Sequence, residues 1–143
     1  MSKITLCLIL FSLMTACNEQ GLQVLDDEAM ILEAHQGQWV FINYWAVWCK
    51  PCIEEIPELN HFSQDARVAV YGFNYDRLDD ANLRLKVEQF GLAYPSLLED
   101  PAVLFNQPAP QALPATLVLN PQGEVARWLF GPQTVSSLTS AIE

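Results

Sequence analysis

The chain has 143 residues, 51% of them hydrophobic, and a formal net charge of −10 at pH 7. This length is sufficient for one compact domain with a hydrophobic core. Because a strongly acidic surface repels phosphate groups, the charge argues against nucleic acid as a partner and against electrostatic docking on anionic lipids.

The first 16 residues have the pattern of an export signal. Lys3 places a positive charge before an apolar run that extends from Ile4 to Leu13. A run of about ten apolar residues is too short to span a bilayer and is typical of a signal peptide. We therefore expect residues 1–16 to be removed and the protein to work outside the cytoplasm.

A cysteine follows this run in a context that suggests lipidation. Met14-Thr15-Ala16-Cys17 resembles the bacterial lipobox, in which the cysteine is diacylated and becomes the first residue. We expect Cys17 to carry a lipid anchor in the inner or the outer membrane, and residues 17–25 to form a tether. Ordinary signal cleavage after Ala16 is the alternative.

The remainder of the chain, residues 26–143, predicts one domain in which helices and strands alternate. In chain order we predict a helix over 26–34, a strand over 39–45, a helix over 49–62, a strand over 68–74, a helix over 79–90, an extended piece over 94–99, a helical turn over 102–105, strands over 116–119 and 125–130, and a helix over 134–142. This order is typical of an α/β fold with a mixed β-sheet that has helices on both faces.

The most informative motif is Cys49-Lys50-Pro51-Cys52, directly after the apolar strand predicted over 39–45. A helix N-terminus can supply the turn that brings two cysteines at this spacing together, and its free N–H groups stabilise a thiolate at the first sulfur. The strand places the pair at the carboxyl edge of the sheet, where α/β folds carry their chemistry. The motif therefore predicts a thiol–disulfide exchange centre.

Two other interpretations of this motif are weaker. A C-x-x-C pair is half of a four-ligand metal site, but no second pair follows it, and His35 and His61 stand alone. A purely structural disulfide would close a loop too short to restrain the unfolded chain. We therefore expect no metal and no cofactor other than the redox-active disulfide.

The residues around the motif resemble the TlpA/ResA-type branch of the thioredoxin-like proteins, which are membrane-tethered thiol–disulfide proteins of the bacterial envelope. Residues 43–52, NYWAVWCKPC, are similar to that branch's NFWAxWCxPC, and residues 52–57 fit its CxxExP continuation. Residues 113–123 look like its VPTTFLIDxxG segment. The resemblance implies a thioredoxin-like fold and a monomeric enzyme that reduces protein disulfides.

The resemblance also implies how the substrate would be held. Pro114 would be the cis-proline that faces the disulfide, and it would leave the backbone of Leu113 free to pair with a substrate chain. The alternative for Pro114 is an ordinary trans proline at the start of a strand. Trp48 and Pro51 would shape and cover the site.

A buried acid is the second feature that the resemblance implies. Asn43 stands where thioredoxin itself has a buried acid, and Glu55, one turn beyond Cys52, is similar to the acid of the TlpA/ResA branch. Glu55 would take the proton from Cys52. The alternative is a solvated carboxylate, which is what we expect of Glu54.

The sequence departs from the family pattern at two places. Lys50 adds a positive charge between the cysteines, which should favour the Cys49 thiolate and make the couple modestly more oxidising. Residues 107–112 replace the segment that usually precedes the cis-proline, so the substrate preference of the family cannot be transferred to this chain.

The implied cycle is attack by an exposed Cys49 thiolate on a substrate disulfide, followed by resolution by a buried Cys52. The implied partners are disulfide-containing envelope proteins and a membrane electron donor of the DsbD or CcdA kind. Two alternatives stay open: a DsbA-like disulfide donor, and a lipoprotein that uses the fold only for binding.

Overall fold

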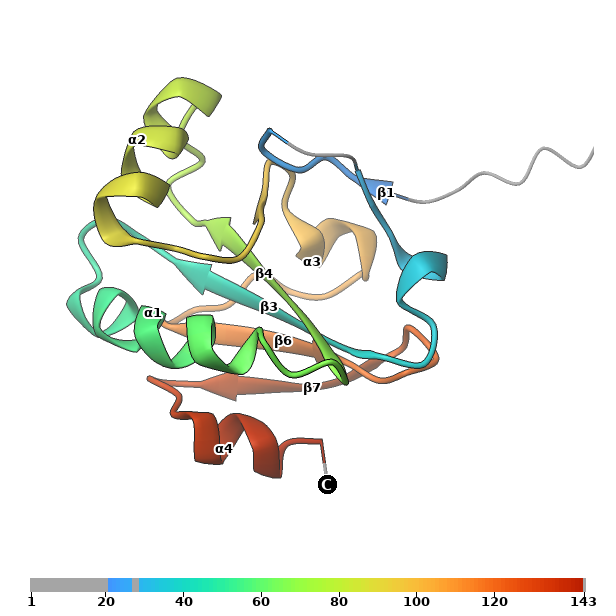
Figure 1. Cartoon of the computed structure of the whole chain (residues 1–143). Coiled ribbons are helices and arrows are strands. Elements are labelled where there is room, and N and C mark those ends of the chain that lie inside the picture. Colours follow the sequence, from blue (N-terminus) through green and yellow to red (C-terminus); the bar gives the residue numbers. More distant parts are fainter. Residues whose placement is uncertain (1–20, 27–28, 143) are drawn as a thin grey trace, which may run out of the picture.

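The centre of the molecule is a five-stranded mixed β-sheet with the strand order β5-β4-β3-β6-β7 (Figure 1). This computed structural model describes residues 21–26 and 29–142. β3 is parallel to β4 and antiparallel to β6, while β5 and β7 form the two edges. The strands are β3 (Trp39–Trp45), β4 (Val68–Asn74), β5 (Ser96–Leu97), β6 (Ala115–Leu119) and β7 (Val125–Phe130).

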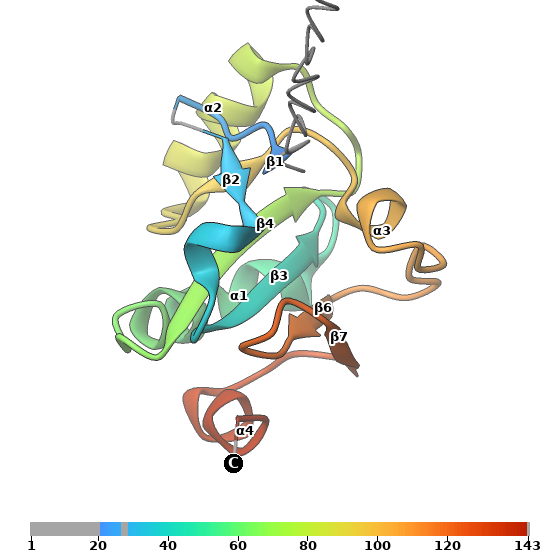
Figure 2. The same ribbon diagram turned by 90° about the vertical axis from the view of Figure 1, so that its right-hand side faces the viewer.

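The two faces of the sheet carry different layers. The helices are α1 (Lys50–Phe62), α2 (Asp80–Phe90), α3 (Pro101–Leu104) and α4 (Val135–Ser140). One face packs against α1, α2 and α4 through side chains that include Ile56, Leu83 and Leu138. The other face packs against α3 and the N-terminal segment through side chains that include Ala102 and Met30, and Figure 2 views this second layer.

The sequence of β3 explains why it is central. Phe41 and Trp45 belong to the core under α1, whereas Ile42 and Tyr44 belong to the core on the opposite face. Every residue from Val40 to Trp45 is therefore buried, as expected for a strand covered on both sides. The strands predicted over 39–45 and 68–74 are confirmed with the same bounds.

The helix predicted over 26–34 is wrong. The chain instead forms β2 (Met30–Ile31) and a 3-10 helix, η1 (Leu32–His35), and β2 pairs with β1 (Gly21–Leu22) in a small antiparallel ribbon. Residues 21–25, which the sequence assigned to the tether, also pack onto the domain, because Leu22 and Val24 are buried in the core. The predicted signal peptide, Cys17 and the rest of the tether lie outside the described residues.

Gly72 in β4 lies beside Asn43 of β3 and leaves room for two aromatic side chains. A Cβ at this position would lie 3.1 Å from Cε2 of Tyr94 and 3.4 Å from Nε1 of Trp45, both of which are buried side chains. We expect Gly72→Ala to lower the free energy of unfolding by about 1–3 kcal/mol through overpacking. Urea unfolding measures this change, and an unaltered midpoint would contradict it.

Candidate active site

The cysteine pair lies at the junction of β3 and α1. Cys49 is the N-cap of the 13-residue helix α1, and its Sγ accepts a hydrogen bond of 3.3 Å from the backbone N–H of Cys52. The two residues form a disulfide, with their Cα atoms 5.3 Å apart. Pro51 fits in the first turn because the N–H that proline lacks has no partner within the helix there. The start of α1 thus directs its N–H groups toward the first sulfur.

The disulfide is covered from solvent. Cys52 is fully buried and Cys49 is only 4% exposed, and both belong to the core between the sheet and α1. The expectation of an exposed Cys49 concerns the thiolate, whereas in the disulfide form the Cys49 side chain is covered. The reason is that the Cys49 sulfur is bonded to a sulfur inside the core, against which Leu113 also packs.

Leu113 and Pro114 lie directly before β6 and beside this core. Their peptide bond is cis, which is the isomer that the resemblance implied. Pro114 is buried and Leu113 is half-buried, with Leu113 in contact with the cores on both faces of the sheet. The carbonyl of Pro114 accepts a hydrogen bond of 2.9 Å from the backbone N–H of Gly131, directly after β7.

Glu55 is a buried acid held by neutral donors. Its Oε1 accepts a hydrogen bond of 2.7 Å from Nδ2 of Asn43, and its Oε2 accepts one of 2.7 Å from the backbone N–H of Gln133. Asn43 also donates to Oγ1 of Thr116, at 3.2 Å. Glu55 is only 2% exposed, so the interpretation as a solvated carboxylate is excluded. It fits Glu54 instead, which is exposed.

Burial determines the proton affinity of Glu55. Removal from water raises its pKa from 4.5 to about 7, although the hydrogen bonds from Gln133 and Asn43 act in the opposite direction. A carboxyl group with this pKa exchanges protons near neutral pH, which suits a general acid or base. Glu55 can therefore take or release a proton three residues beyond Cys52 on the same helix.

The raised pKa of Glu55 makes stability depend on pH. Between pH 4.5 and about 7 the folded protein binds more protons than the unfolded chain, so stability falls as the pH rises through this interval. We expect the oxidised protein to lose up to about 3 kcal/mol between pH 5 and pH 8 from this group. Urea unfolding at both pH values should show a smaller loss for Glu55→Gln, and an equal loss in both proteins would contradict the assignment.

Trp48 is exposed beside the disulfide but is held in place. Its side chain is 68% exposed, and its Nε1 donates a hydrogen bond of 2.8 Å to Oδ1 of Asp76. The other carboxylate oxygen of Asp76 accepts from the backbone N–H of Val47 at 3.3 Å. Asp76 thus fixes the loop before Cys49, and the sequence analysis missed it. The only signal for it was an acidic residue two positions after β4.

Lys50, which the sequence analysis expected to make the couple modestly more oxidising, lies at the surface. Its side chain is 85% exposed, and its Nζ lies 3.2 Å from Oε1 of Glu54. The paired carboxylate and the solvent both weaken the field of the cation at Cys49. We therefore expect Lys50 to shift the properties of the couple only slightly.

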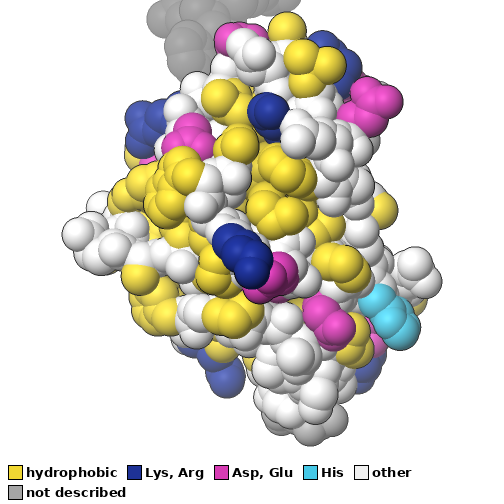
Figure 3. Space-filling view, turned by 90° about the vertical axis from the view of Figure 1, so that its left-hand side faces the viewer, with side chains coloured by type: hydrophobic (Ala, Val, Ile, Leu, Met, Phe, Trp, Pro, Cys, Tyr) yellow, Lys and Arg dark blue, Asp and Glu magenta, His cyan; other side chains and the backbone are white. Residues whose placement is uncertain are grey.

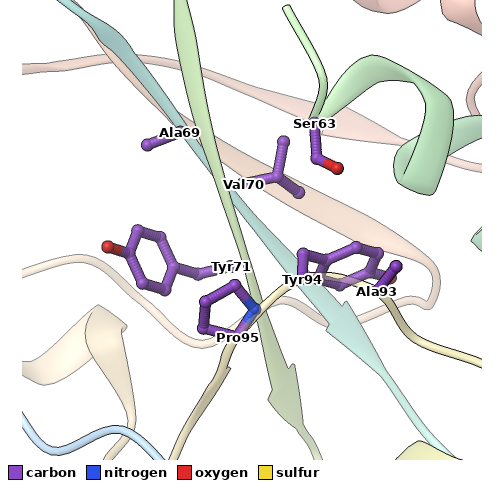
Figure 4. A pocket seen from close by; sticks show the side chains of 7 residues that line it. All are labelled: Ser63, Ala69, Val70, Tyr71, Ala93, Tyr94 and Pro95. Carbon is purple, nitrogen blue, oxygen red and sulfur yellow. The ribbon is translucent and has the colours of Figure 1, made fainter. Parts of the chain in front are cut away.

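No other group of residues in the described part of the chain has the composition of a reaction centre. No cluster of three or more histidine, cysteine or acidic residues suited to a metal ion occurs among residues 21–26 and 29–142. A pocket of about 220 Å³ next to β4 contains no cysteine and no charged side chain, as Figure 4 shows. His35 hydrogen-bonds to Tyr71 at 2.7 Å, and His61 is exposed on α1.

The fold and the disulfide together define a class: a thioredoxin-like domain with a C-x-x-C disulfide at the start of α1. The chain belongs to the AhpC/TSA family, whose model matches residues 14–128. It is 27% identical over 117 residues to the thiol-disulfide oxidoreductase ResA of Bacillus thuringiensis, and this alignment covers 80% of the chain and 67% of that relative.

Two solved structures are also similar. The structure of StoA from Bacillus subtilis has a TM-score of 0.68 at 21% identity, covering 87% of this chain and 96% of that one. A secreted thiol-disulfide isomerase from Corynebacterium glutamicum has a TM-score of 0.69 at 26% identity, covering 86% and 80%. The comparisons confirm the thioredoxin-like fold and the TlpA/ResA-type class of thiol–disulfide oxidoreductases.

Proposed function

We propose that the protein reduces disulfides in exported proteins through the Cys49–Cys52 dithiol. The observation that carries this proposal is the combination of a C-x-x-C disulfide at the start of α1 with a buried acid whose pKa is about 7 on the same helix. An inert disulfide would have no use for such an acid, because a buried carboxyl group costs stability when it ionises.

The reaction transfers two electrons from the dithiol to the substrate. The Cys49 thiolate attacks one sulfur of the substrate disulfide, the substrate S–S bond breaks, and its other sulfur leaves as a thiolate that takes up a proton. The Cys52 thiol then gives its proton to Glu55, and its sulfur attacks the Cys49 sulfur of the mixed disulfide. The Cys49–Cys52 bond forms, the bond between the Cys49 sulfur and the substrate breaks, and the second substrate sulfur leaves as a thiolate that takes up a proton from water.

The surroundings of the pair support these steps. The N–H groups at the start of α1 stabilise the attacking thiolate relative to the thiol. The Glu55 carboxylate is held by Asn43 and by the backbone of Gln133 before any proton arrives. The extended backbone at Leu113 pairs with the substrate chain, as in strand addition to a sheet.

The proposal includes the setting of the protein. It is exported, anchored to a membrane of the bacterial envelope through lipidated Cys17, and faces the periplasm as a monomer. A DsbD- or CcdA-type membrane donor reduces the disulfide again, and no cofactor besides this disulfide takes part. Within the described residues no helix combines the length and apolar character needed to cross a bilayer.

The direct test is the reduction of insulin disulfides by reduced full-length protein, with free thiols alkylated after an acid quench and counted on each of the two proteins by mass spectrometry. We expect two thiols of insulin to appear for each dithiol consumed, and the Cys49→Ser variant to release none above background. Consumption of the dithiol without thiols on the substrate would contradict the proposal. Whether Cys17 carries lipid is tested separately, by growing cells with a labelled fatty acid and measuring its incorporation into the protein.

A further inference from the structure

A second feature at this end of the molecule is an apolar pocket next to the Leu113–Pro114 segment. It has a volume of about 240 Å³ and lies between residues 108–112 on one side and Trp128 and Phe130 on the other. Residues 108–112 belong to the loop in which the sequence departs from the TlpA/ResA pattern. One side of the pocket is therefore formed by a loop whose sequence differs from the family pattern.

The pocket exposes apolar side chains whose contact with water is unfavourable. None of the residues that line it carries a charge, and the Phe130 side chain is 60% exposed. Phe130 stacks on Trp128 with ring centroids 6.0 Å apart and the ring planes 17° apart. The two nearly parallel rings form an apolar surface against which another apolar side chain can pack.

The pocket is continuous with the segment that the substrate is proposed to follow. Residue 112 leads directly into Leu113 and Pro114, and Phe130 pairs with Ala115 in the next register position across β6 and β7. The loop is tied to the end of β4, because the Tyr75 hydroxyl donates to the carbonyl of Pro110 at 3.4 Å. Figure 3 shows hydrophobic side chains gathered over the end of the molecule where β3 and β4 end.

We infer that this pocket binds one large aliphatic or aromatic side chain of the substrate protein, a few residues along the chain from the cysteine that Cys49 attacks. The substrate segment is extended, because it pairs with the backbone at Leu113, and such a segment presents its side chains to the surface beside that strand. The inference rests on the proposed function and gives the substrate class: disulfide-bonded segments in which an apolar residue is accessible.

The net charge of the chain further restricts the class of substrate segments that can bind. The chain has a formal net charge of −10, whereas the pocket itself is uncharged. Acidic substrate segments are therefore repelled, and neutral or basic ones are favoured. Folded proteins bury most of their large apolar side chains, so incompletely folded substrates offer more side chains that the pocket can bind.

The test uses pairs of synthetic peptides, each with one intramolecular disulfide, that differ only by leucine or serine at one position near a cysteine. Successive pairs move this position along the peptide, and the rate of reduction by reduced full-length protein is measured for each. We expect the leucine peptide to react about tenfold faster at one position, because its side chain leaves water there. Phe130→Ser and Ala109→Asp should bring this ratio close to one.

The matched control is Val103→Ser, since the Val103 side chain is 80% exposed and lies outside the pocket. This variant should keep the wild-type ratio. Equal rates for both peptides at every position, or an unchanged ratio in Phe130→Ser, would overturn the inference while leaving the proposed function intact. If the wild type were a dimer, and Phe130→Ser became a monomer without a change in the leucine-to-serine rate ratio, the occupant of the pocket would be a second copy of the chain, and the inference would be overturned. Failure to reduce any peptide would overturn both.

Discussion

The Cys52→Ser variant should accumulate mixed disulfides between Cys49 and substrate proteins. Without the second sulfur the first step proceeds, but nothing attacks the Cys49 sulfur afterwards, so release of the substrate falls to the background rate of external thiols. The variant should be expressed with its export signal in bacteria, and the cells quenched with acid. Non-reducing electrophoresis should then show adducts that disappear after treatment with dithiothreitol. The absence of any adduct would contradict the assignment of Cys52 as the resolving residue.

The matched control for this variant is Cys49→Ser. It retains Cys52, whose side chain is fully buried in the disulfide form, and it should form no adducts and reduce no substrate. Adducts in Cys49→Ser at the level of Cys52→Ser would show that the two cysteines have the opposite roles.

The Glu55→Gln variant should slow the resolving step by about 10²-fold at pH 7, since general base catalysis typically contributes at least that factor. Glutamine keeps the shape of the side chain but cannot accept a proton. In the wild type, the rate should rise as the pH increases through about 7, because only the ionised carboxylate accepts the proton of Cys52. Stopped-flow measurement of mixed-disulfide decay as a function of pH checks both effects.

Glu54→Gln is the control for Glu55→Gln, because the Glu54 carboxylate is exposed and forms a surface ion pair with Lys50. Its resolving rate and pH profile should match those of the wild type. If Glu54→Gln and Glu55→Gln behaved alike, a specific role for the buried acid would be contradicted.

The part of the fold around the site could be predicted from local patterns. The seven residues from Trp39 to Trp45 form a nearly continuous apolar run without regular alternation of polar and apolar side chains. Such a run is typical of a strand that is buried on both faces of a sheet. The helix α2 begins after Asp79 and ends at Gly91, which has the left-handed conformation that a helix stop requires. These signals lie within one element, so the sequence alone reveals them.

The N-terminal segment shows where local patterns fail. The apolar residues near Met30 suggested a helix, but Met30 pairs with Leu22 across β1 and β2, and both side chains are buried in the core. Two-residue strands carry almost no periodicity. Their formation depends on packing against the sheet, which a short window of sequence does not contain.

The site was predictable in its side chains but not in its contacts. The cysteine spacing pointed to the chemistry and the family resemblance pointed to Glu55, whereas one of the two hydrogen-bond partners of Glu55 is a backbone N–H 78 residues away, at Gln133. Asp76, which holds Trp48, is 28 residues distant from it. A backbone group carries no residue-type signal, and one acid among many exposed acids has no distinguishing pattern.

The central claim, that this dithiol donates electrons, is tested most directly by its reduction potential. The Cys49–Cys52 couple of the full-length protein should be equilibrated with glutathione buffers and its oxidised fraction measured. We predict a value near or below the roughly −270 mV of thioredoxin, which a membrane donor can sustain in the reduced state. A value near the roughly −120 mV of a strong oxidant would contradict the reductase assignment and indicate disulfide donation instead.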